Sequence, residues 1–193
     1  MPAGPRARLI LNTILTVMEH GVHATGLTEL LERSDASPDS LYRHFPLGKE
    51  ELVGTAAKSV SRMGYSHVSR MADALATAPS LEGWLDELFA YWRDPLESSD
   101  YRVGSFMMAA ALYGQDPAVQ SAAGQAFTEW TARLADGLIA AGIDRAPACS
   151  MAALLLLTIE GAIVQSRALQ SSHPFDCASA QLAVLLRHHL TSR

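Results

Sequence analysis

Apolar residues recur every three or four positions along most of the chain, which is the spacing of one face of an α-helix. The first such set starts at Leu11 and is followed by Gly21, so we predict a helix over about residues 6–20. A second, shorter set centres on Leu30. Thr25 stands just before it, where a hydroxyl can cap free backbone N–H groups, so this set predicts a second helix.

A third and a fourth helix follow after a short polar connection. Ser37 is a typical N-cap residue, and Pro38 suits the first position of a helix because no N–H is needed there. Pro46 and Gly48 end this third helix, and a long fourth helix is predicted from Lys49 to about residue 78. Two short helices joined by a tight turn form a helix-turn-helix, in which the second helix is the candidate for insertion into a DNA groove.

The remainder of the chain continues as helices, with no β-type alternation and no internal repeat. We therefore predict an all-α fold of about nine helices, with a helix-turn-helix head in residues 1–50 and a larger helical body in residues 51–193. The later helices are predicted at about 81–93, 102–114, 117–141, 147–171 and 175–191.

The third helix has two faces of different character. Leu41 and Phe45 lie four residues apart, so they share one face and can pack on the leucines of the second helix. The other side chains can donate to phosphates or to base edges, and Arg43 can bind a guanine bidentately. From this pattern alone, a DNA-binding face and a solvated face beside a packing turn explain the residues equally well. The outward residues are Ser40, Tyr42, Arg43 and His44, and Lys49 adds a cation at the start of the fourth helix.

The charge of the chain gives DNA binding little support. The formal net charge is −5. Residues 1–70 contain eight Lys or Arg and seven Asp or Glu, whereas the rest of the chain contains seven and thirteen. The acidic excess therefore lies in the C-terminal part, and the N-terminal part is close to neutral.

Composition predicts a cytoplasmic protein that needs no cofactor and no metal. Hydrophobic residues make up 49% of the chain, enough for a buried core. Cys149 and Cys177 are too few for a disulfide framework and are expected to be core thiols. The most apolar run starts at Met151 and meets Glu160 after nine residues, short of the roughly 20 that a bilayer requires. No secretion signal and no metal-ligand spacing occur.

The stretch GVHATGLTELLERSDASPDSLYRHFPLGKEELV, residues 21–53, resembles the N-terminal domain of TetR-type transcriptional regulators. Together with the later GSFMMAAAL, it is most similar to the LmrA/YxaF-like branch. The resemblance implies a regulator, commonly a repressor, that binds double-stranded operator DNA. It also implies phosphate contacts for Thr25 and Tyr42, a backbone anchor at Lys49 and base contacts at or near Ser40, Arg43 and His44, with Ser37 in the same set.

Two places depart from the pattern of the family. Asp35 stands in the turn where the family usually has Gly, and Asp tolerates a left-handed backbone. Pro38 and Asp39 replace a Lys-Gly pair at the start of the recognition helix, which removes a positive charge and adds a negative one. We therefore expect low non-specific affinity, with Asp39 either capping the helix or accepting from a cytosine amino group.

The resemblance further implies a small-molecule chamber in the body and a homodimer made by the last two helices. Aromatic and Met side chains at helical spacing are more often plain core, and Glu160 could equally pair with Arg167. A two-fold dimer would place two recognition helices on one duplex. The predicted chamber for an apolar or amphipathic effector comprises Trp84, Phe89, Met107, Met108, Tyr113, Phe127 and Trp130, with Glu160 and Gln165 as polar lining. The predicted interface comprises Leu155, Ile159, Ala162, Ile163, Leu182, Leu185, Leu186 and His189.

Two other classes of protein remain as alternatives. A helical ligand-binding or scaffold protein that does not bind DNA would show the same helix pattern. An enzyme would need a nucleophile with a base, paired carboxylates or a phosphate cradle, and the corresponding motifs do not occur in the sequence. We therefore predict that the protein is not an enzyme.

Overall fold

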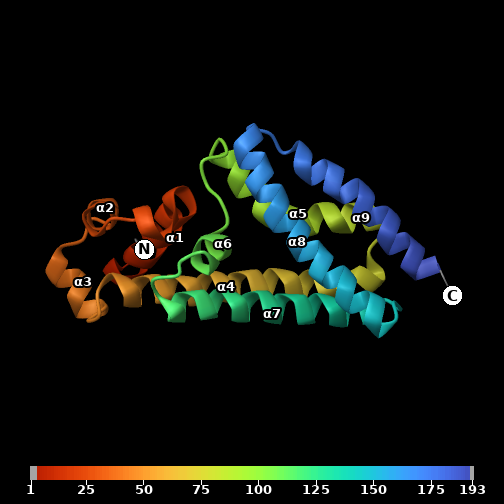
Figure 1. Cartoon of the computed structure of the whole chain (residues 1–193), viewed down its shortest axis with the longest axis horizontal. Helices are drawn as coiled ribbons and strands as arrows, with labels where there is room; N and C mark the ends of the chain where they lie inside the picture. The colour runs from red at the N-terminus through yellow and green to blue at the C-terminus, as the bar shows by residue number, and fades with distance from the viewer. Residues whose placement is uncertain (1–3, 192–193) are drawn as a thin grey trace. The chain divides into compact units, whose positions relative to one another are not determined.

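The computed structural model describes residues 4–191, and over this range the chain forms nine α-helices, one short 3₁₀ turn and no strand (Figure 1). The predicted all-α fold is confirmed. In chain order the elements are α1 (Pro5–Ala24), α2 (Leu27–Arg33), α3 (Pro38–His44), α4 (Lys49–Ala74), the 3₁₀ turn η1 (Leu75–Thr77), α5 (Leu81–Ser98), α6 (Phe106–Ala111), α7 (Pro117–Ala140), α8 (Arg145–Leu169) and α9 (His173–Thr191).

The chain divides into two compact units. The first comprises the chain up to Arg62 together with Ser105–Gln125, and the second comprises Met63–Gly104 together with the chain from Ala126 onward. α4 and α7 each contribute a segment to both units. The division by role at residue 50 stays a prediction, since the compact units follow the packing of the helices rather than their functions.

The first unit is built around α1, which packs on α2, α3 and α6. Leu41 and Phe45 of α3 are 0% and 1% exposed, so the predicted inward face of this helix is confirmed. α1, α2 and α4 supply the apolar side chains around them. The resulting core cluster comprises Leu9, Leu30, Leu41, Phe45 and Leu52, with Ile10, Leu27, Leu31 and Ala36 packed against it.

The turn between α2 and α3 depends on one left-handed residue. Asp35 has a φ of 46°. Its N–H donates to the carbonyl of Glu32 at 3.2 Å, and the N–H of Ala36 donates to the carbonyl of Leu31 at 3.0 Å. This pair of bonds forms a Schellman motif in which Asp35 takes the place that usually holds Gly. Asp35 therefore preserves the tight turn, as expected from the sequence.

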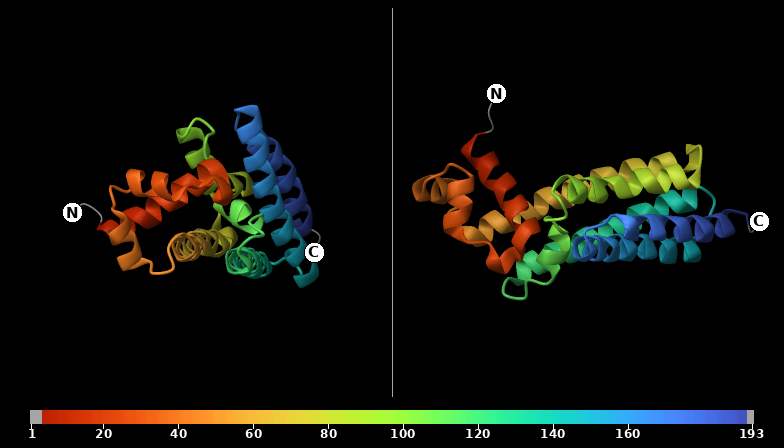
Figure 2. Two further views of the ribbon diagram at one scale, coloured as in Figure 1. Left: turned by 60° about the vertical axis from the view of Figure 1, so that its left-hand side comes forward. Right: turned by 90° about the horizontal axis from the view of Figure 1, so that it is seen from above.

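In the second unit, α5, α8 and α9 pack on one another, and α8 and α9 lie side by side (Figures 1 and 2). The α4 and α7 segments of this unit approach closely at two glycines. A Cβ at Gly64 would overlap the indole of Trp130, and a Cβ at Gly137 would overlap the backbone of Ala72. Small residues at these two places therefore set the spacing between the helices.

Some helix ends differ from the prediction. α5 continues through Pro95 to Ser98. A proline so near the end of a helix removes a single backbone hydrogen bond, and Leu96, which is 2% exposed, anchors the last turn in the core. α6 is shorter than predicted: it spans Phe106–Ala111, residues 102–105 before it have no regular secondary structure, and a turn follows it.

α8 is more apolar over its whole length than the run from Met151 suggested. Among the described residues it is the one helix whose length and composition would also suit a membrane span. In the structure, 44% of that stretch is buried inside the protein. Packing against the rest of the second unit therefore accounts for much of its apolar character.

The close approach of α4 and α7 makes Gly64 sensitive to substitution. We expect Gly64→Ala to lower the free energy of unfolding by about 1–3 kcal/mol, because the added methyl group overlaps the ring of Trp130. Gly54 is a matched control on the same helix, since nothing lies within 4 Å of a Cβ there. Gly54→Ala should raise the free energy of unfolding by about 0.5–1 kcal/mol through helix propensity. Chemical denaturation measures both values, and equal effects would contradict this packing.

Candidate nucleic-acid interface

The first turn of α3 is held by its own cap. The hydroxyl of Ser37 accepts a hydrogen bond from the N–H of Ser40 at 3.2 Å, and Pro38 follows at the first helical position. The predicted start of the helix is thus confirmed. The cap fixes the turn that precedes the predicted base contacts.

α3 presents an aromatic and charged face to solvent. Tyr42 is 52% exposed, and Asp39 and Arg43 are exposed beside it. Ser40 and His44 are half-buried. The outward orientation predicted for Tyr42 and Arg43 is therefore present, while the contacts of this face with DNA stay predictions.

The ring of Tyr42 rests against the turn that follows α3. Gly48 in this turn has a φ of 71°, which favours glycine. A Cβ at Gly48 would lie 3.3 Å from Cε1 of Tyr42, so the absence of a side chain also makes room for the ring. The turn therefore holds the phenol at the edge of the exposed face, where it can donate to a phosphate oxygen.

Lys49 forms part of the internal structure as well as of the predicted site. Its Nζ donates to the carbonyl of Val22 at 3.2 Å, which links the start of α4 to the last turn of α1. Burial lowers the pKa of the Lys49 ammonium. An ammonium has three N–H donors, so this bond leaves capacity for a phosphate oxygen. The anchoring role of Lys49 stays a prediction.

Thr25 occupies a different place from the one expected. Gly26, not Thr25, is the N-cap residue of α2, and it makes no side-chain cap bond. The side chain of Thr25 is buried, and its hydroxyl donates to the carbonyl of Gly21 at 2.7 Å. Gly21 interrupts α1 with a φ of 80°, so this bond closes the kink at the end of the helix. The structure corrects the assignment of Thr25 to a cap, and its burial speaks against a phosphate contact.

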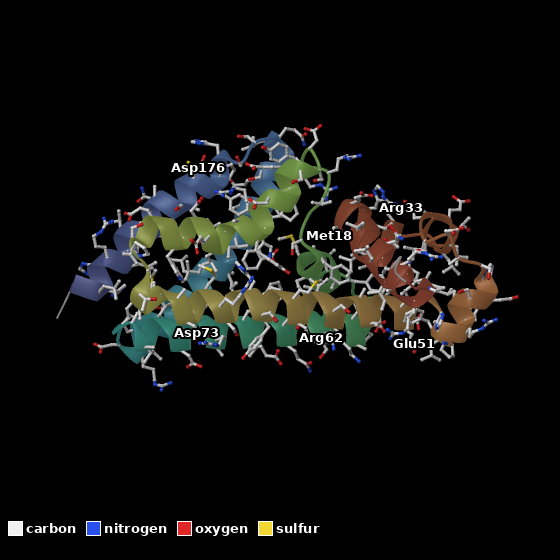
Figure 3. All side chains as sticks on the ribbon, turned by 180° about the vertical axis from the view of Figure 1, so that it is seen from behind. Met18, Arg33, Glu51, Arg62, Asp73 and Asp176 are labelled. Atoms are coloured by element: carbon white, nitrogen blue, oxygen red, sulfur yellow. The ribbon has the colours of Figure 1, made fainter. Side chains whose placement is uncertain are left out.

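Arg33 of α2 is bonded to side chains of α1, and Figure 3 labels it. Its Nη1 donates to the hydroxyl of Thr16 at 2.9 Å and to the carboxylate of Glu19 at 2.8 Å. The hydrogen bond that Arg33 donates to the Glu19 carboxylate raises the pKa of the Arg33 guanidinium. Arg33 is therefore committed to holding the first two helices together, whereas Arg43 extends from α3 into solvent.

The residues predicted to form an effector chamber lie in both compact units. Three belong to the first unit and six to the second. Four of them have the burial of ordinary core residues, so one shared chamber stays a prediction. The buried ones are Trp84, Phe89, Met107 and Trp130, and the half-buried ones are Met108, Tyr113, Phe127 and Glu160.

Gln165 is one of the two residues predicted as polar lining of the chamber. It is exposed and lines a groove of about 630 Å³ along α8 and α9. Gln165 lies four residues after Gly161, so the two residues share one face of α8, and both line that groove. Gln165 therefore lies at the surface of the second unit, and its contact with an effector stays a prediction.

A histidine that the sequence did not single out lies in an aromatic cluster of the second unit. His67 of α4 is 6% exposed, and its Nε2–H donates to the carbonyl of Leu88 at 2.9 Å. Its ring stacks on Tyr91 with centroids 4.7 Å apart. Trp92 meets the same ring edge-on at 5.6 Å and faces Trp130 at 6.2 Å. Burial lowers the pKa of the imidazole, which keeps a neutral polar group among aromatic rings.

Most of the predicted interface residues are buried within a single chain. Side chains that pack in the core of the second unit offer little surface to a partner. Leu185 and His189 of the set reach the surface, and Ala162, Leu182 and Leu185 line the groove along α8 and α9, so the predicted interface stays a prediction. The buried members are Leu155, Ile159, Ala162, Ile163, Leu182 and Leu186, each 4% exposed or less.

A second apolar stripe on the same two helices faces solvent. Leu157 is 71% exposed, Val164 is 49% exposed and Val184 of α9 is 56% exposed. Gly161 lies between the first two and lines the groove along α8 and α9. This outer stripe, defined as the exposed residues Leu154, Leu157, Val164, Leu169, Val184 and Leu185, has the composition of a surface that packs on another helix.

Sequence reasoning missed the outer stripe because α8 is apolar on both faces, so periodicity alone cannot tell the core face from the exposed one. The seven-residue spacing of Leu157 and Val164 was the available signal. Cys149 and Cys177 are exposed free thiols, which corrects the expectation of core thiols.

α3 follows α2 after a Schellman turn, buries its inner face in the core and exposes its outer face to solvent. This arrangement defines a DNA-binding protein of the helix-turn-helix class. Residues 10–69 match the model of the tetR family of bacterial regulatory proteins. Residues 83–181 match the model of the C-terminal domain of LmrA/YxaF-like transcriptional regulators. The chain therefore belongs to the TetR family of transcriptional regulators, and the resemblance to its LmrA/YxaF-like branch is confirmed.

Relatives support the same class along the whole chain. An uncharacterised HTH-type transcriptional regulator of Mycobacterium tuberculosis is 32% identical over 198 residues, which covers 98% of each chain. The regulator LmrA of Bacillus subtilis is 27% identical and covers 86% of this chain and 88% of its own. A TetR transcriptional regulator from Legionella pneumophila shares the fold with a TM-score of 0.82 at 16% identity, over 94% of this chain and 96% of its own. These relatives are regulators rather than enzymes, in agreement with the predicted class.

Proposed function

We propose that this protein is a ligand-responsive repressor that binds operator DNA as a homodimer and leaves it when a small apolar or amphipathic molecule binds. The observation that carries the proposal is the division of α3 into a buried face, with Leu41 and Phe45, and an exposed face with Tyr42 and Arg43. Its place of action is the cytoplasm, where the two exposed thiols stay reduced.

The exposed face of α3 supports a division of labour between affinity and specificity. Tyr42 stands at the edge of the helix against Gly48, which suits a phosphate contact. Arg43 extends from the same face, where a guanidinium can bind the O6 and N7 atoms of guanine. Asp39 is exposed in the first turn and repels phosphates, so affinity for arbitrary DNA should be low.

The outer stripe supports the homodimer. Contiguous exposed apolar side chains on α8 and α9 are unfavourable in water, and a second copy of the same helices would cover them. Gly161 in the groove allows close approach of a partner helix. A two-fold axis then supplies two copies of α3 to one duplex, as palindromic operators require.

The aromatic cluster around His67 supports the effector. Aromatic rings suit an apolar or amphipathic ligand, and the Arg70 guanidinium, whose Nη2 lies 3.4 Å from Nδ1 of His67, is the nearby group for a polar contact, because Nε2 of His67 already donates to Leu88. α4 carries both His67 and Lys49, so one continuous helix connects the cluster to the DNA-binding head. A ligand can weaken DNA binding by no more than the difference between its affinities for the conformation that does not bind DNA and the one that does.

The first prediction for this function separates backbone contacts from base contacts. Against duplexes selected by the wild-type protein from a random library, Tyr42→Phe should weaken binding to every sequence alike. Arg43→Ala should weaken binding by about 1–3 kcal/mol at particular base pairs and less elsewhere, because a bidentate contact is specific to one base. Titrations against single-base variants of the selected duplex measure both. Uniform losses from Arg43→Ala would make Arg43 a backbone contact instead.

The second prediction concerns the dimer. Leu157→Glu or Val164→Glu should weaken self-association by at least about 100-fold, because each places a charge in an apolar interface. Leu112→Glu is the matched control, since Leu112 is 76% exposed, close to the 71% of Leu157, but lies in the first unit. Sedimentation equilibrium compares the three variants. Dimers that persist in both α8 variants would show that the outer stripe is not the interface.

The third prediction concerns the effector. Apolar compounds that bind the cluster should change the tryptophan fluorescence and raise the Kd for the selected duplex at the same concentrations. The change should persist in Trp84→Phe, because Trp84 lies outside the cluster and donates to the carbonyl of Met71 at 2.7 Å. It should be reduced in Trp92→Phe, whose ring meets His67. If a broad panel of apolar compounds changes neither the fluorescence nor the Kd, these aromatic residues are ordinary core residues and not an effector site.

A further inference from the structure

The first turn of α1 contacts the segment that leads into the recognition helix. Nε of Arg8 donates to the carbonyl of Ser34 at 2.9 Å, and its Nη2 donates to the carbonyl of Asp35 at 2.8 Å. The same Nη2 lies 3.8 Å from the carboxylate of Asp35. One planar guanidinium therefore binds two successive carbonyls at the end of α2, where the helix itself supplies no donors.

The same turn of α1 also contacts the other end of the recognition helix. The guanidinium of Arg6 lies 5.3 Å from the centroid of the Phe45 ring, within the range of a cation–π contact. Phe45 is the residue that ends α3 and is part of the core cluster. Two arginines, two positions apart in α1, thus touch the turn before α3 and the residue that closes it.

We propose that Arg6 and Arg8 are positioning residues for α3: they set the placement of the recognition helix from its two ends without needing to touch bases. This inference rests on the proposed DNA-binding function. Arg8 is the stronger of the two, because its hydrogen bonds hold the two peptide groups on either side of Asp35.

Physical considerations explain why α3 needs such support. It has seven residues, too few for a helix to be stable by itself. The turn before it contains a non-glycine residue in the left-handed region, which is an unfavourable backbone conformation for a residue with a side chain. A bidentate base contact tolerates little displacement, so small movements of this turn would act on specificity before they act on overall affinity.

Lysine cannot replace Arg8 in this role, although it keeps the charge. An ammonium is a compact point charge, whereas the two carbonyls require donors in the fixed fork of a guanidinium. A phosphate contact depends mainly on charge, so lysine would largely preserve it, whereas lysine would not preserve the positioning role. The effect of Arg8→Lys therefore distinguishes the two roles. Arg8→Lys and Arg8→Met together therefore test the inference.

The first test uses hydrogen exchange on the full-length protein without DNA. Asp35 and Ala36 donate their N–H groups inside the turn, so they report its opening. Arg8→Met and Arg8→Lys should both speed exchange of these amides by about fivefold or more, since each removes hydrogen bonds from the turn. Arg43→Met is the matched control on α3 and should leave their exchange unchanged. Wild-type exchange in both Arg8 variants would overturn the inference.

The second test measures discrimination between the selected duplex and a scrambled duplex at several salt concentrations. Arg8→Lys should reduce the ratio of the two affinities by about tenfold while the slope of log K against log salt stays at the wild-type value. Arg6→Met should act in the same direction with a smaller effect. Full rescue by Arg8→Lys, together with a slope that falls by about one in Arg8→Met, would instead make Arg8 a phosphate contact.

The two tests keep failure of the inference distinct from failure of the proposed function. A wild-type protein that selects no duplex would contradict the DNA-binding proposal, and the exchange of the turn amides would still decide the role of Arg8. Melting curves check that each variant is folded, and Arg8→Lys provides the milder substitution.

Discussion

The burial of Leu41 and Phe45 in the core of the first unit is the interaction on which the DNA-binding face depends. Both side chains are almost completely buried against Leu9, Leu30 and Leu52. Removing each from water contributes roughly 1.5–3 kcal/mol, a large share of the stability of so short a helix. Because a helix has opposite faces, this burial turns Tyr42 and Arg43 outward. Apolar contacts on the inner face of α3 therefore orient its polar face, together with the α2–α3 turn, to which Arg8 donates hydrogen bonds.

In the second unit, α8 also has to remove apolar side chains from water. α8 has apolar side chains on both faces, and the core of the second unit covers those of one face. Its inner side chains, such as Leu155 and Ile159, fill the core, and Leu157 on the opposite face stays in water. By length and composition alone, α8 would also suit a membrane span. In the structure, 44% of that stretch is buried in the helical body, and this packing accounts for much of its apolar composition. The surplus apolar face is the reason to propose a second copy of the chain as its partner.

Local signals in the sequence were sufficient for the head and insufficient for the body. Caps, prolines and glycines act within one turn of chain, so α3, with Ser37 and Pro38 at its start, was predicted correctly. Thr25 was misassigned because Gly26 took the cap position and left the hydroxyl free for Gly21. The faces of α8 depend on tertiary packing that periodicity does not record. For the same reason, the sequence did not single out Arg8, whose hydrogen bonds to Ser34 and Asp35 depend on the position of the α2–α3 turn.

We propose that two copies of α3 bind one duplex through the exposed face that carries Tyr42 and Arg43. Hydroxyl-radical footprinting on a duplex selected by the wild-type protein tests it most directly. We expect two protected patches, related by two-fold sequence symmetry and separated by about one helical turn or a multiple of it. A single asymmetric patch, or a protein that protects no duplex, would show that α3 does not bind DNA in this way.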